Sequence, residues 1–275
     1  MPRKLGVLAG GGPLPGQLVA ACRETGREFF VVAFEGATDP NPIADGPHAW
    51  VRLGAVGRTI RLLRKAAVEE VVLAGPVPRP SLASLAPEAR ALKLLAKLGK
   101  GVLGDDRILS LIVAELESEG FRVVGVDSIL TRLLVAPGPL GKLVPDGEAE
   151  ADIAVGSRIA RALGALDVGQ AVVVQQGVVL GVEAMEGTDA LLARCGRLRR
   201  NGPGGVLVKV KKPGQEPRAD LPTIGPRTVT ASAEAGLRGI AVEAGATLVL
   251  DRAAVAEAAD RCDLFVVGIP VPDPD

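Results

Sequence analysis

The chain has 275 residues, a length typical of one large or two ordinary domains, and we expect two. Its hydrophobic fraction of 48% and charged fraction of 23% are those of a globular protein, which excludes a disordered or fibrous chain. Lysine plus arginine and aspartate plus glutamate both count 32, with no basic stripe along the sequence, so a typical nucleic-acid-binding protein is excluded too.

The first half alternates short apolar runs with amphipathic stretches, an order typical of βαβ units. The predicted strands are Leu5–Ala9, Phe29–Phe34, Val71–Ala74 and Phe121–Val126. The predicted helices are Leu14–Glu24, one around Arg58–Ala66, Ala86–Leu98 and Ile108–Glu119. Strands that alternate with helices in this way predict a doubly wound parallel sheet, and the chain is therefore expected to be an α/β protein.

A segment rich in proline and glycine follows at 137–147, and we expect it to be a linker. It would separate an N-terminal domain at 1–136 from a C-terminal domain at 148–275. The predicted strands of the second domain are Ala171–Val174, Val178–Glu183, Gly204–Lys209, Thr247–Leu250 and Leu264–Gly268, and its predicted helices are Glu148–Leu163, Thr188–Arg199 and one between the last two strands. The first two strands are close enough to form an antiparallel hairpin, so this domain is expected to be mixed α/β.

The cysteines and the N-terminus bear on location. Cys22, Cys195 and Cys262 are odd in number and lack C-x-x-C spacing, which argues against disulfides and structural zinc and favours a reducing compartment. The apolar run after the N-terminus is too short for a signal peptide, and no run approaches the roughly 18 residues of a membrane span. We expect a cytoplasmic protein.

The first candidate site is a glycine turn between the first strand and the first helix. Gly10, Gly11 and Gly12 with Leu14 could bind a phosphate through backbone N–H groups and the helix N-terminus. The dinucleotide fingerprint is only partly met, because Pro15 occupies the position of its third glycine. The alternative is a turn in which glycine serves the βα geometry alone.

The second candidate site follows the strand that ends near Val182. Glu183, Glu186 and Asp189 gather there with the hydroxyl of Thr188, a set that suits Mg²⁺ or a hydroxyl-bearing ligand. A solvated loop is the alternative.

The third candidate site is a rigid loop that begins with Lys209, Lys211 and Lys212 and continues through 220–228. These lysines, with Arg218 and Arg227, supply cations for a phosphate ligand, and Asp220 could orient water or bind a metal. The further substrate-binding candidates here are Thr223, Gly225 and Thr228. A solvated basic loop with a capping aspartate is the alternative.

Several chemistries lack support. The only histidine, His48, lies in a predicted loop, and there is no G-x-S-x-G elbow for a Ser-His-Asp triad. The glycine turn is not followed by Lys-Ser or Lys-Thr, so a P-loop ATPase is excluded. Gly10, Gly12 and Glu35 leave an NAD-binding oxidoreductase as one alternative, and a non-catalytic lipid or nucleotide carrier is another.

Four motifs in sequence give the chain a family resemblance. LAGGGPLP at 8–15, GDDRILSLIVAELESEGF at 104–121, VEAMEGTDALL at 182–192 and KVKKPGQEPRADLPTIGPRTV at 209–229 resemble the bacterial UDP-2,3-diacylglucosamine pyrophosphatases of the LpxI type. Their order and spacing cover nearly the whole chain. The resemblance implies a Rossmann-like parallel-sheet N-terminal domain, a separate mixed α/β C-terminal domain, and substrate held between the two.

The resemblance also implies an activity and a pathway. Family members hydrolyse UDP-2,3-diacylglucosamine by attack of water on the α-phosphorus, giving UMP and 2,3-diacylglucosamine 1-phosphate (lipid X) in lipid A biosynthesis, with Mg²⁺ or another divalent metal. The counterpart of Asp220 is catalytic in the family. Asp220, Glu183, Glu186 and Asp189 are then the candidate metal ligands, with Lys209, Lys211 and Thr228 as phosphate ligands.

The implied partners follow from the substrate. Burying the two acyl chains of the substrate should contribute about 0.8 kcal/mol of binding free energy per CH₂ group, so we expect an apolar groove. Because such a substrate starts in a bilayer, we also expect peripheral contact with the inner membrane. A homodimer is a further expectation, and no nucleic acid is expected.

Overall fold

The computed structural model describes residues 2–77 and 105–271, and these form two compact units. Unit 1 comprises the residues up to Thr131 together with Glu216–Asp220, and unit 2 comprises Arg132–Gln215 together with the residues from Leu221 onward. The chain therefore leaves unit 2 for a short segment and then returns to it. The predicted helix at 86–98 lies outside the described residues.

Unit 1 contains a five-stranded sheet in the order β3-β2-β1-β4-β5, in which every pair of neighbours is parallel. The strands are β1 (Leu5–Ala9), β2 (Phe29–Phe34), β3 (His48–Val51), β4 (Glu70–Ala74) and β5 (Arg122–Val123), and the helices are α1 (Leu14–Glu24), α2 (Val56–Lys65), α4 (Asp105–Ser118) and α5 (Val126–Ile129), with 3-10 turns η1 (Asn41–Ile43) and η2 (Thr131–Leu133), the last spanning the division point. This strand order is that of a Rossmann fold. The predicted α/β class and Rossmann-like sheet are confirmed.

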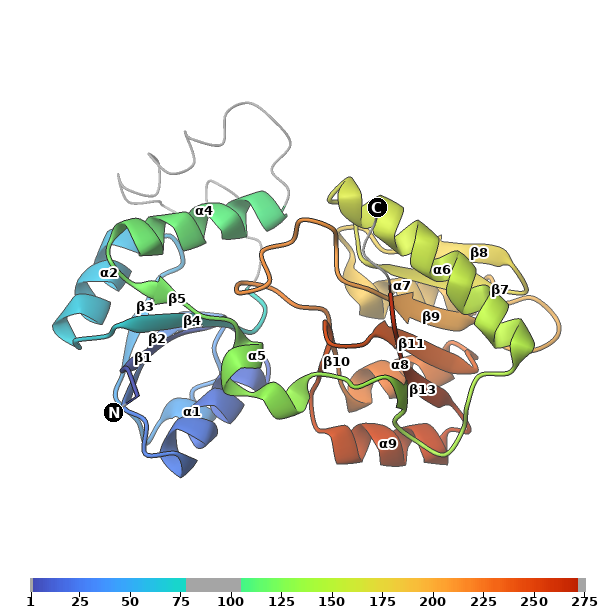
Figure 1. Cartoon of the computed structure of the whole chain (residues 1–275), viewed down its shortest axis with the longest axis horizontal. Coiled ribbons are helices and arrows are strands. Elements are labelled where there is room, and N and C mark those ends of the chain that lie inside the picture. Colours follow the sequence, from blue (N-terminus) through green and yellow to red (C-terminus); the bar gives the residue numbers. More distant parts are fainter. Residues whose placement is uncertain (1, 78–104, 272–275) are drawn as a thin grey trace. The chain divides into compact units, whose positions relative to one another are not determined.

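Helices cover both faces of this sheet, with α2 and α4 on one face and α1 and α5 on the other (Figure 1). Ile60 of α2 and Val113 of α4 pack with Leu8 and Val32 of the strands in one buried cluster. Because both faces are covered, the strands are mostly apolar, and β1 is buried along its whole length. This explains why the bounds of β1, α1 and β2 could be predicted from the sequence.

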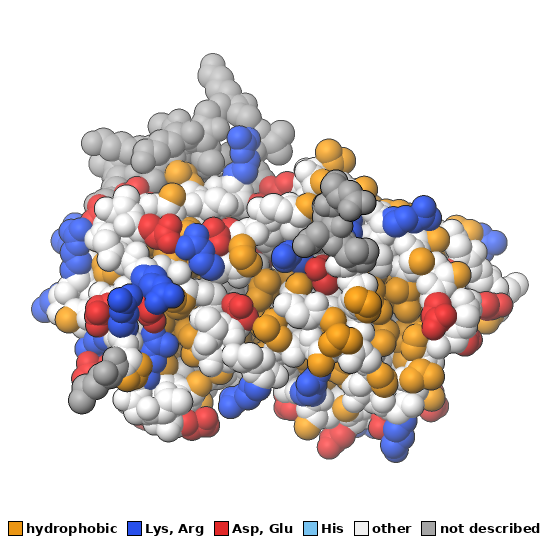
Figure 2. All heavy atoms as spheres, in the orientation of Figure 1, with side chains coloured by type: hydrophobic (Ala, Val, Ile, Leu, Met, Phe, Trp, Pro, Cys, Tyr) orange, Lys and Arg blue, Asp and Glu red, His pale blue; other side chains and the backbone are white. Residues whose placement is uncertain are grey.

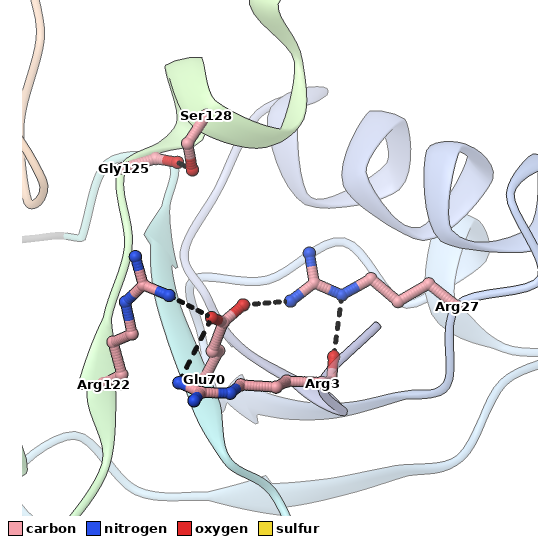
Figure 3. Close-up of polar contacts among 6 residues, drawn as sticks. All are labelled: Arg3, Arg27, Glu70, Arg122, Gly125 and Ser128. Carbon is pink, nitrogen blue, oxygen red and sulfur yellow. Dashed lines mark hydrogen bonds and ion pairs between the residues drawn. The ribbon is translucent and has the colours of Figure 1, made fainter. Parts of the chain in front are cut away.

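Two predictions in unit 1 are corrected. His48 begins strand β3, which pairs with β2, and does not lie in a loop. The strand predicted at Phe121–Val126 is shorter, because the chain turns into α5 after Gly125. Ser128 closes that turn by donating its hydroxyl to the Gly125 carbonyl at 2.7 Å (Figure 3).

Charged side chains gather where the strands of unit 1 begin. The Glu70 carboxylate lies between three arginines (Figure 3): Arg27 at 2.5 Å, Arg122 at 3.0 Å and Arg3 at 4.0 Å. Glu70 and Arg122 are the first residues of β4 and β5, so this cluster marks the edge of the sheet opposite to the glycine turn that follows β1. Elsewhere on the face drawn in Figure 2, positive and negative side chains are interspersed.

Unit 2 contains a six-stranded mixed sheet in the order β6-β13-β11-β9-β7-β8 and a two-stranded parallel sheet of β10 and β12. The strands are β6 (Gly138–Pro139), β7 (Ala171–Gln175), β8 (Val178–Val182), β9 (Val206–Lys209), β10 (Thr223–Ile224), β11 (Gly239–Glu243), β12 (Leu248–Val249) and β13 (Phe265–Ile269), and the helices are α6 (Gly147–Ala165), α7 (Gly187–Gly196), α8 (Pro226–Glu234) and α9 (Arg252–Arg261). The predicted mixed α/β class is confirmed.

Alternate side chains of these strands enter different cores. Val172 of β7 and Val208 of β9 pack with α6 on one face, whereas Val173 and Leu207 pack with α7, α8 and α9 on the other (Figure 1). The central strand β11 pairs with both β9 and β13 and was not predicted. Gly138–Pro139, inside the predicted linker, pairs with β13, so the segment 137–147 lies within unit 2.

No helix in the described ranges is both long and apolar enough to cross a membrane. The three cysteines are free, with Cys22 and Cys195 buried and Cys262 partly exposed. Burial raises the pKa of both the Cys22 and the Cys195 thiol, which keeps them in the neutral form.

The predicted β7–β8 hairpin is confirmed, and a buried carboxylate stabilises its turn. Gln176 and Gly177 both have positive φ, 52° and 74°, as a two-residue type I′ turn requires. Asp152 of α6 is 1% exposed and accepts hydrogen bonds from the N–H groups of Gln176 at 3.0 Å and Gly177 at 2.7 Å. The helix therefore sets the position of the turn.

We expect Asp152→Ala to lower the free energy of unfolding by about 2 kcal/mol, because two hydrogen bonds to a charged acceptor are lost. Asp152→Asn keeps one acceptor oxygen and should lose less. Chemical denaturation of the native chain and both variants measures this. Equal stability of all three would show that the turn does not depend on Asp152.

Candidate functional site

The glycine turn of unit 1 connects β1 to α1 and meets the loop that follows β4. The N–H of Gly10 donates to the Ala74 carbonyl at 2.8 Å, and that of Gly11 donates to the Pro76 carbonyl at 2.7 Å. A Cβ atom on Gly10 would lie only 2.4 Å from the Gly75 carbonyl oxygen. The two loops thus touch backbone to backbone at the point where a Rossmann sheet reverses its strand order.

This contact changes the role expected of the turn. The amides of Gly10 and Gly11 already donate to unit 1 itself, and their predicted contact with substrate stays a prediction. Pro13 and Pro15 have no N–H, whereas Gly12, at φ 73°, and Leu14 have amides that a ligand could use. Glycine is required here first of all for the close approach of the two loops.

The three carboxylates after β8 have separate partners. Glu183 is 6% exposed and accepts from the Thr188 hydroxyl at 2.5 Å and from the Gln170 N–H at 3.1 Å. Glu186 pairs with Arg194 at 2.7 Å, and Asp189 pairs with Arg227 at 3.2 Å.

These partners explain the lowered pKa of Glu186 and bear on the predicted metal site. The hydrogen bond from its own backbone N–H, together with Arg194, holds the pKa of Glu186 below its usual range. Across the described residues, no group of three or more histidine, cysteine, aspartate or glutamate side chains is placed to hold a metal ion. Glu183, Glu186 and Asp189 therefore do not converge on one cation, although they are near neighbours in sequence.

The lysines of the 209–212 segment also differ from one another. Lys209 is 7% exposed, and its ammonium donates to the Thr188 hydroxyl at 3.0 Å and the Thr223 carbonyl at 3.4 Å. Lys212 is committed to an ion pair with Asp167 at 2.8 Å. Lys211 uses its backbone N–H, which donates to Glu243 at 2.7 Å, and its side chain has no ion-pair partner in the described part of the chain. Lys209 and Lys211 are thus the lysines left for a ligand.

The start of α8 contains the remaining hydroxyl candidates. Gly225 is the N-cap, and its N–H donates to the Thr228 hydroxyl at 3.3 Å, while the Thr228 N–H donates to the Gly225 carbonyl at 2.9 Å. Thr223 donates its hydroxyl to the Leu221 carbonyl at 3.1 Å. Helix capping accounts for the hydrogen bonds of the Thr228 hydroxyl and N–H with Gly225. The contact of Thr228 with substrate stays a prediction.

Asp220 is the last residue of the short segment Glu216–Asp220, which belongs to unit 1. Its N–H donates to the Glu216 carbonyl at 3.1 Å, which closes a turn, and Ala219 packs against the buried cluster of unit 1. Arg218 pairs with Glu216 at 2.7 Å and with Glu117 of α4 at 2.6 Å. The Arg218 hydrogen bond lowers the pKa of Glu216, and the two carboxylates raise the pKa of Arg218. This ion-pair network attaches the Asp220 turn to unit 1.

Sequence reasoning missed three of these side chains. Glu117 and Glu216 attach the Asp220 turn, and Glu243 at the end of β11 accepts from the Lys211 backbone. A glutamate directly after an apolar run was the available signal for Glu243, but the strand itself had not been predicted. Glu117 gave no signal, since it lies 101 residues from Arg218 in the chain.

Comparison with known proteins matches both the N-terminal and the C-terminal half of the chain to one family. The family model described as the LpxI N-terminal domain matches residues 4–133, and the LpxI C-terminal domain matches residues 136–267. The chain is 44% identical over 274 residues, 97% of its length and 98% of the relative's, to a protein of Caulobacter vibrioides named UDP-2,3-diacylglucosamine pyrophosphatase LpxI. A solved biotin carboxylase domain of Hydrogenobacter thermophilus 2-oxoglutarate carboxylase, 15% identical over 64% of this chain and 35% of that one, has a TM-score of only 0.25, which supports no argument.

We expect Gly10→Ala to destabilise the fold by about 3 kcal/mol, because the new Cβ would collide with the backbone of Gly75 and Pro76, which cannot rotate away. Gly147→Ala is the matched control, since a Cβ at that position would meet no described atom within 4 Å and the φ of Gly147 is not positive. Thermal unfolding compares the two. A Gly10→Ala chain as stable as the control would contradict the close contact.

The Glu216–Arg218 pair predicts a pH dependence. Because the folded pKa of Glu216 is lowered from 4.5, its contribution to stability is complete above about pH 4.5 and is lost as the pH falls through the lowered value. Glu216→Gln should therefore be less stable than the native chain at pH 7, with the difference shrinking as the pH falls below about 4.5. Denaturation at several pH values measures it, and a difference that does not vary with pH would refute the pairing.

Proposed function

The chain belongs to the LpxI family, and we propose that it hydrolyses the pyrophosphate bond of UDP-2,3-diacylglucosamine in lipid A biosynthesis. The observation that carries this proposal is the match of both halves of the chain to the two LpxI domains, with 44% identity over 97% of its length to the named pyrophosphatase. The proposed enzyme class is a hydrolase acting on a diphosphate. UMP and lipid X are the proposed products.

The chemistry sets what the residues have to do. Cleavage of a pyrophosphate increases charge on phosphoryl oxygens, so positioned cations and a positioned water matter more than a covalent nucleophile. Lys209 supports the proposal because it is a buried ammonium at the carboxyl end of β9, the edge at which α/β sheets bind ligands. Lys211, two residues further, is the second proposed phosphate ligand.

Asp220 is the proposed catalytic carboxylate. The Arg218 network holds its turn in unit 1, and the turn supplies a defined backbone for a carboxylate that orients the attacking water. Gly12, Leu14, Thr188, Thr223 and Gly225 remain proposed contacts for the substrate.

Mg²⁺ is the proposed metal, and the structure limits which residues could hold it. The carboxylates of Glu183, Glu186 and Asp189 have hydrogen-bond or ion-pair partners of their own and do not fit a shared metal site. Mg²⁺ is commonly held by one or two carboxylates together with substrate phosphates, and Asp220 suits that arrangement. Bound there, the ion would neutralise phosphoryl charge.

Attack at the α-phosphorus stays a prediction. Attack on either phosphorus yields UMP and lipid X, so the products alone do not distinguish the two. Peripheral contact with the inner membrane and a homodimer also stay predictions.

One of the two alternative functions loses support. An NAD-binding oxidoreductase needs the amides of the glycine turn for the pyrophosphate, and those of Gly10 and Gly11 are hydrogen-bonded to unit 1 itself. Glu35, its expected ribose ligand, is exposed after β2. A non-catalytic carrier would bind the substrate without turnover, and the following experiment separates it from an enzyme.

We expect the native chain to release UMP from UDP-2,3-diacylglucosamine with Mg²⁺, and to stop when EDTA is present. Asp220→Asn, of the same size but uncharged, should lower kcat at least about 100-fold while still binding substrate, because the water loses its orienting carboxylate.

Asp45→Asn is the control, an exposed aspartate of the same unit that should leave activity unchanged. Substrate binding by the native chain with no UMP release would favour the carrier. Release that persists in EDTA would overturn the metal proposal alone.

A further inference from the structure

Three polar side chains of unit 2 form one hydrogen-bonded chain, with a buried side chain at each end and a partly exposed one between them. The Lys209 ammonium donates to the Thr188 hydroxyl at 3.0 Å, and that hydroxyl lies 2.5 Å from the Glu183 carboxylate. Glu183 and Lys209 are 6% and 7% exposed. Within the described residues they make no direct ion pair, so the threonine is the only side chain that joins the two charges.

The direction of these hydrogen bonds is fixed by chemistry. An ionised carboxylate only accepts, so the single O–H of Thr188 has to point at Glu183. An ammonium only donates, so Thr188 has to present a lone pair to Lys209. The second Glu183 oxygen accepts from the Gln170 N–H at 3.1 Å, which fixes the carboxylate at its other end.

This arrangement determines how many N–H groups of the Lys209 ammonium remain for a ligand. Its ammonium has three N–H groups, of which one is directed to Thr188 and one to the Thr223 carbonyl. The third has no acceptor among the described residues. This donor is open to water or to a ligand, and because an ammonium makes a stronger, charge-assisted hydrogen bond to an anionic oxygen, it suits a phosphoryl oxygen.

We infer that Glu183 is a positioning residue for the reaction, acting through Thr188 to hold the Lys209 ammonium where it meets a phosphoryl oxygen. The inference rests on the proposed function and gives Glu183 a role other than the metal ligand expected from the sequence. The effect of Glu183 on the Lys209 ammonium is indirect, since Glu183 contacts Thr188 and not the ammonium.

Thr188→Val tests this chain with little change of shape, because it replaces the hydroxyl by a methyl group. Lys209 then loses its acceptor, and we expect the Kd for inorganic pyrophosphate, measured by calorimetry, to rise about 10-fold. Thr188→Ser restores the hydroxyl and should bring the Kd back to within about threefold of the native value. Glu183→Gln should weaken binding in the same direction, since an amide no longer enforces the hydrogen-bond direction.

A double-mutant cycle separates positioning from a general loss of structure. If Thr188 acts through Lys209, Thr188→Val should have no further effect on the Kd in a Lys209→Met background. Thr230→Val, at an exposed threonine of α8, is the matched control and should bind pyrophosphate like the native chain. Thermal unfolding of each variant confirms that it is folded.

The binding measurement and UMP release answer different questions. Weaker pyrophosphate binding by Thr188→Val, rescued by serine and absent in the Lys209→Met background, supports the inference even if the native chain released no UMP, in which case only the proposed function fails. Unchanged binding by Thr188→Val, or an equal loss in the Lys209→Met background, overturns the inference even if the native chain is active. A native chain that does not bind pyrophosphate overturns it as well.

Discussion

A buried ammonium must be compensated, and much of unit 2 around the candidate site follows from that constraint. Lys209 ends β9 inside the unit, where its charge would be costly without partners. Thr188 at the start of α7, Glu183 after β8 and the Thr223 carbonyl of β10 supply them from separate elements. Glu183 and Lys209 are joined through the Thr188 hydroxyl and not by a direct ion pair. A direct ion pair could have used the N–H group that Lys209 keeps for a ligand.

Unit 1 obeys a different constraint, the close approach of two backbone loops. Gly10 and Gly75 let the β1 and β4 loops touch, and the resulting hydrogen bonds occupy amides that a dinucleotide-binding protein would offer to its cofactor. Unit 1 therefore has the strand order of a Rossmann fold without leaving these amides free for a dinucleotide. Unit 1 instead anchors the Asp220 turn, because Arg218 pairs with Glu117 of α4.

Local pattern was enough for elements with a clear apolar or amphipathic period. The bounds of β1, α1 and β2 could be predicted because each has an unbroken apolar run or a helical period between glycine-rich turns. Strand β11 was not predicted, because its apolar run at 240–242 is short and the pairing of Gly239–Glu243 with β9 and β13 is seen only in the structure. In the site, Glu183, Thr188 and Lys209 were chosen singly, but their order of hydrogen bonds depends on tertiary contacts. Glu183 was predicted as a metal ligand because it lies near Glu186 and Asp189 in the sequence, whereas its hydrogen bond to Thr188 is seen only in the structure.

The proposed reaction is cleavage of the UDP-2,3-diacylglucosamine pyrophosphate by water, and oxygen labelling is its sharpest test. Turnover in ¹⁸O-water, followed by mass spectrometry of both products, should place one ¹⁸O atom on one product and none on the other. The predicted attack on the α-phosphorus places it on UMP. Label on lipid X would keep hydrolysis and move the attack to the other phosphorus, whereas unlabelled products, or no products, would contradict hydrolysis by this chain.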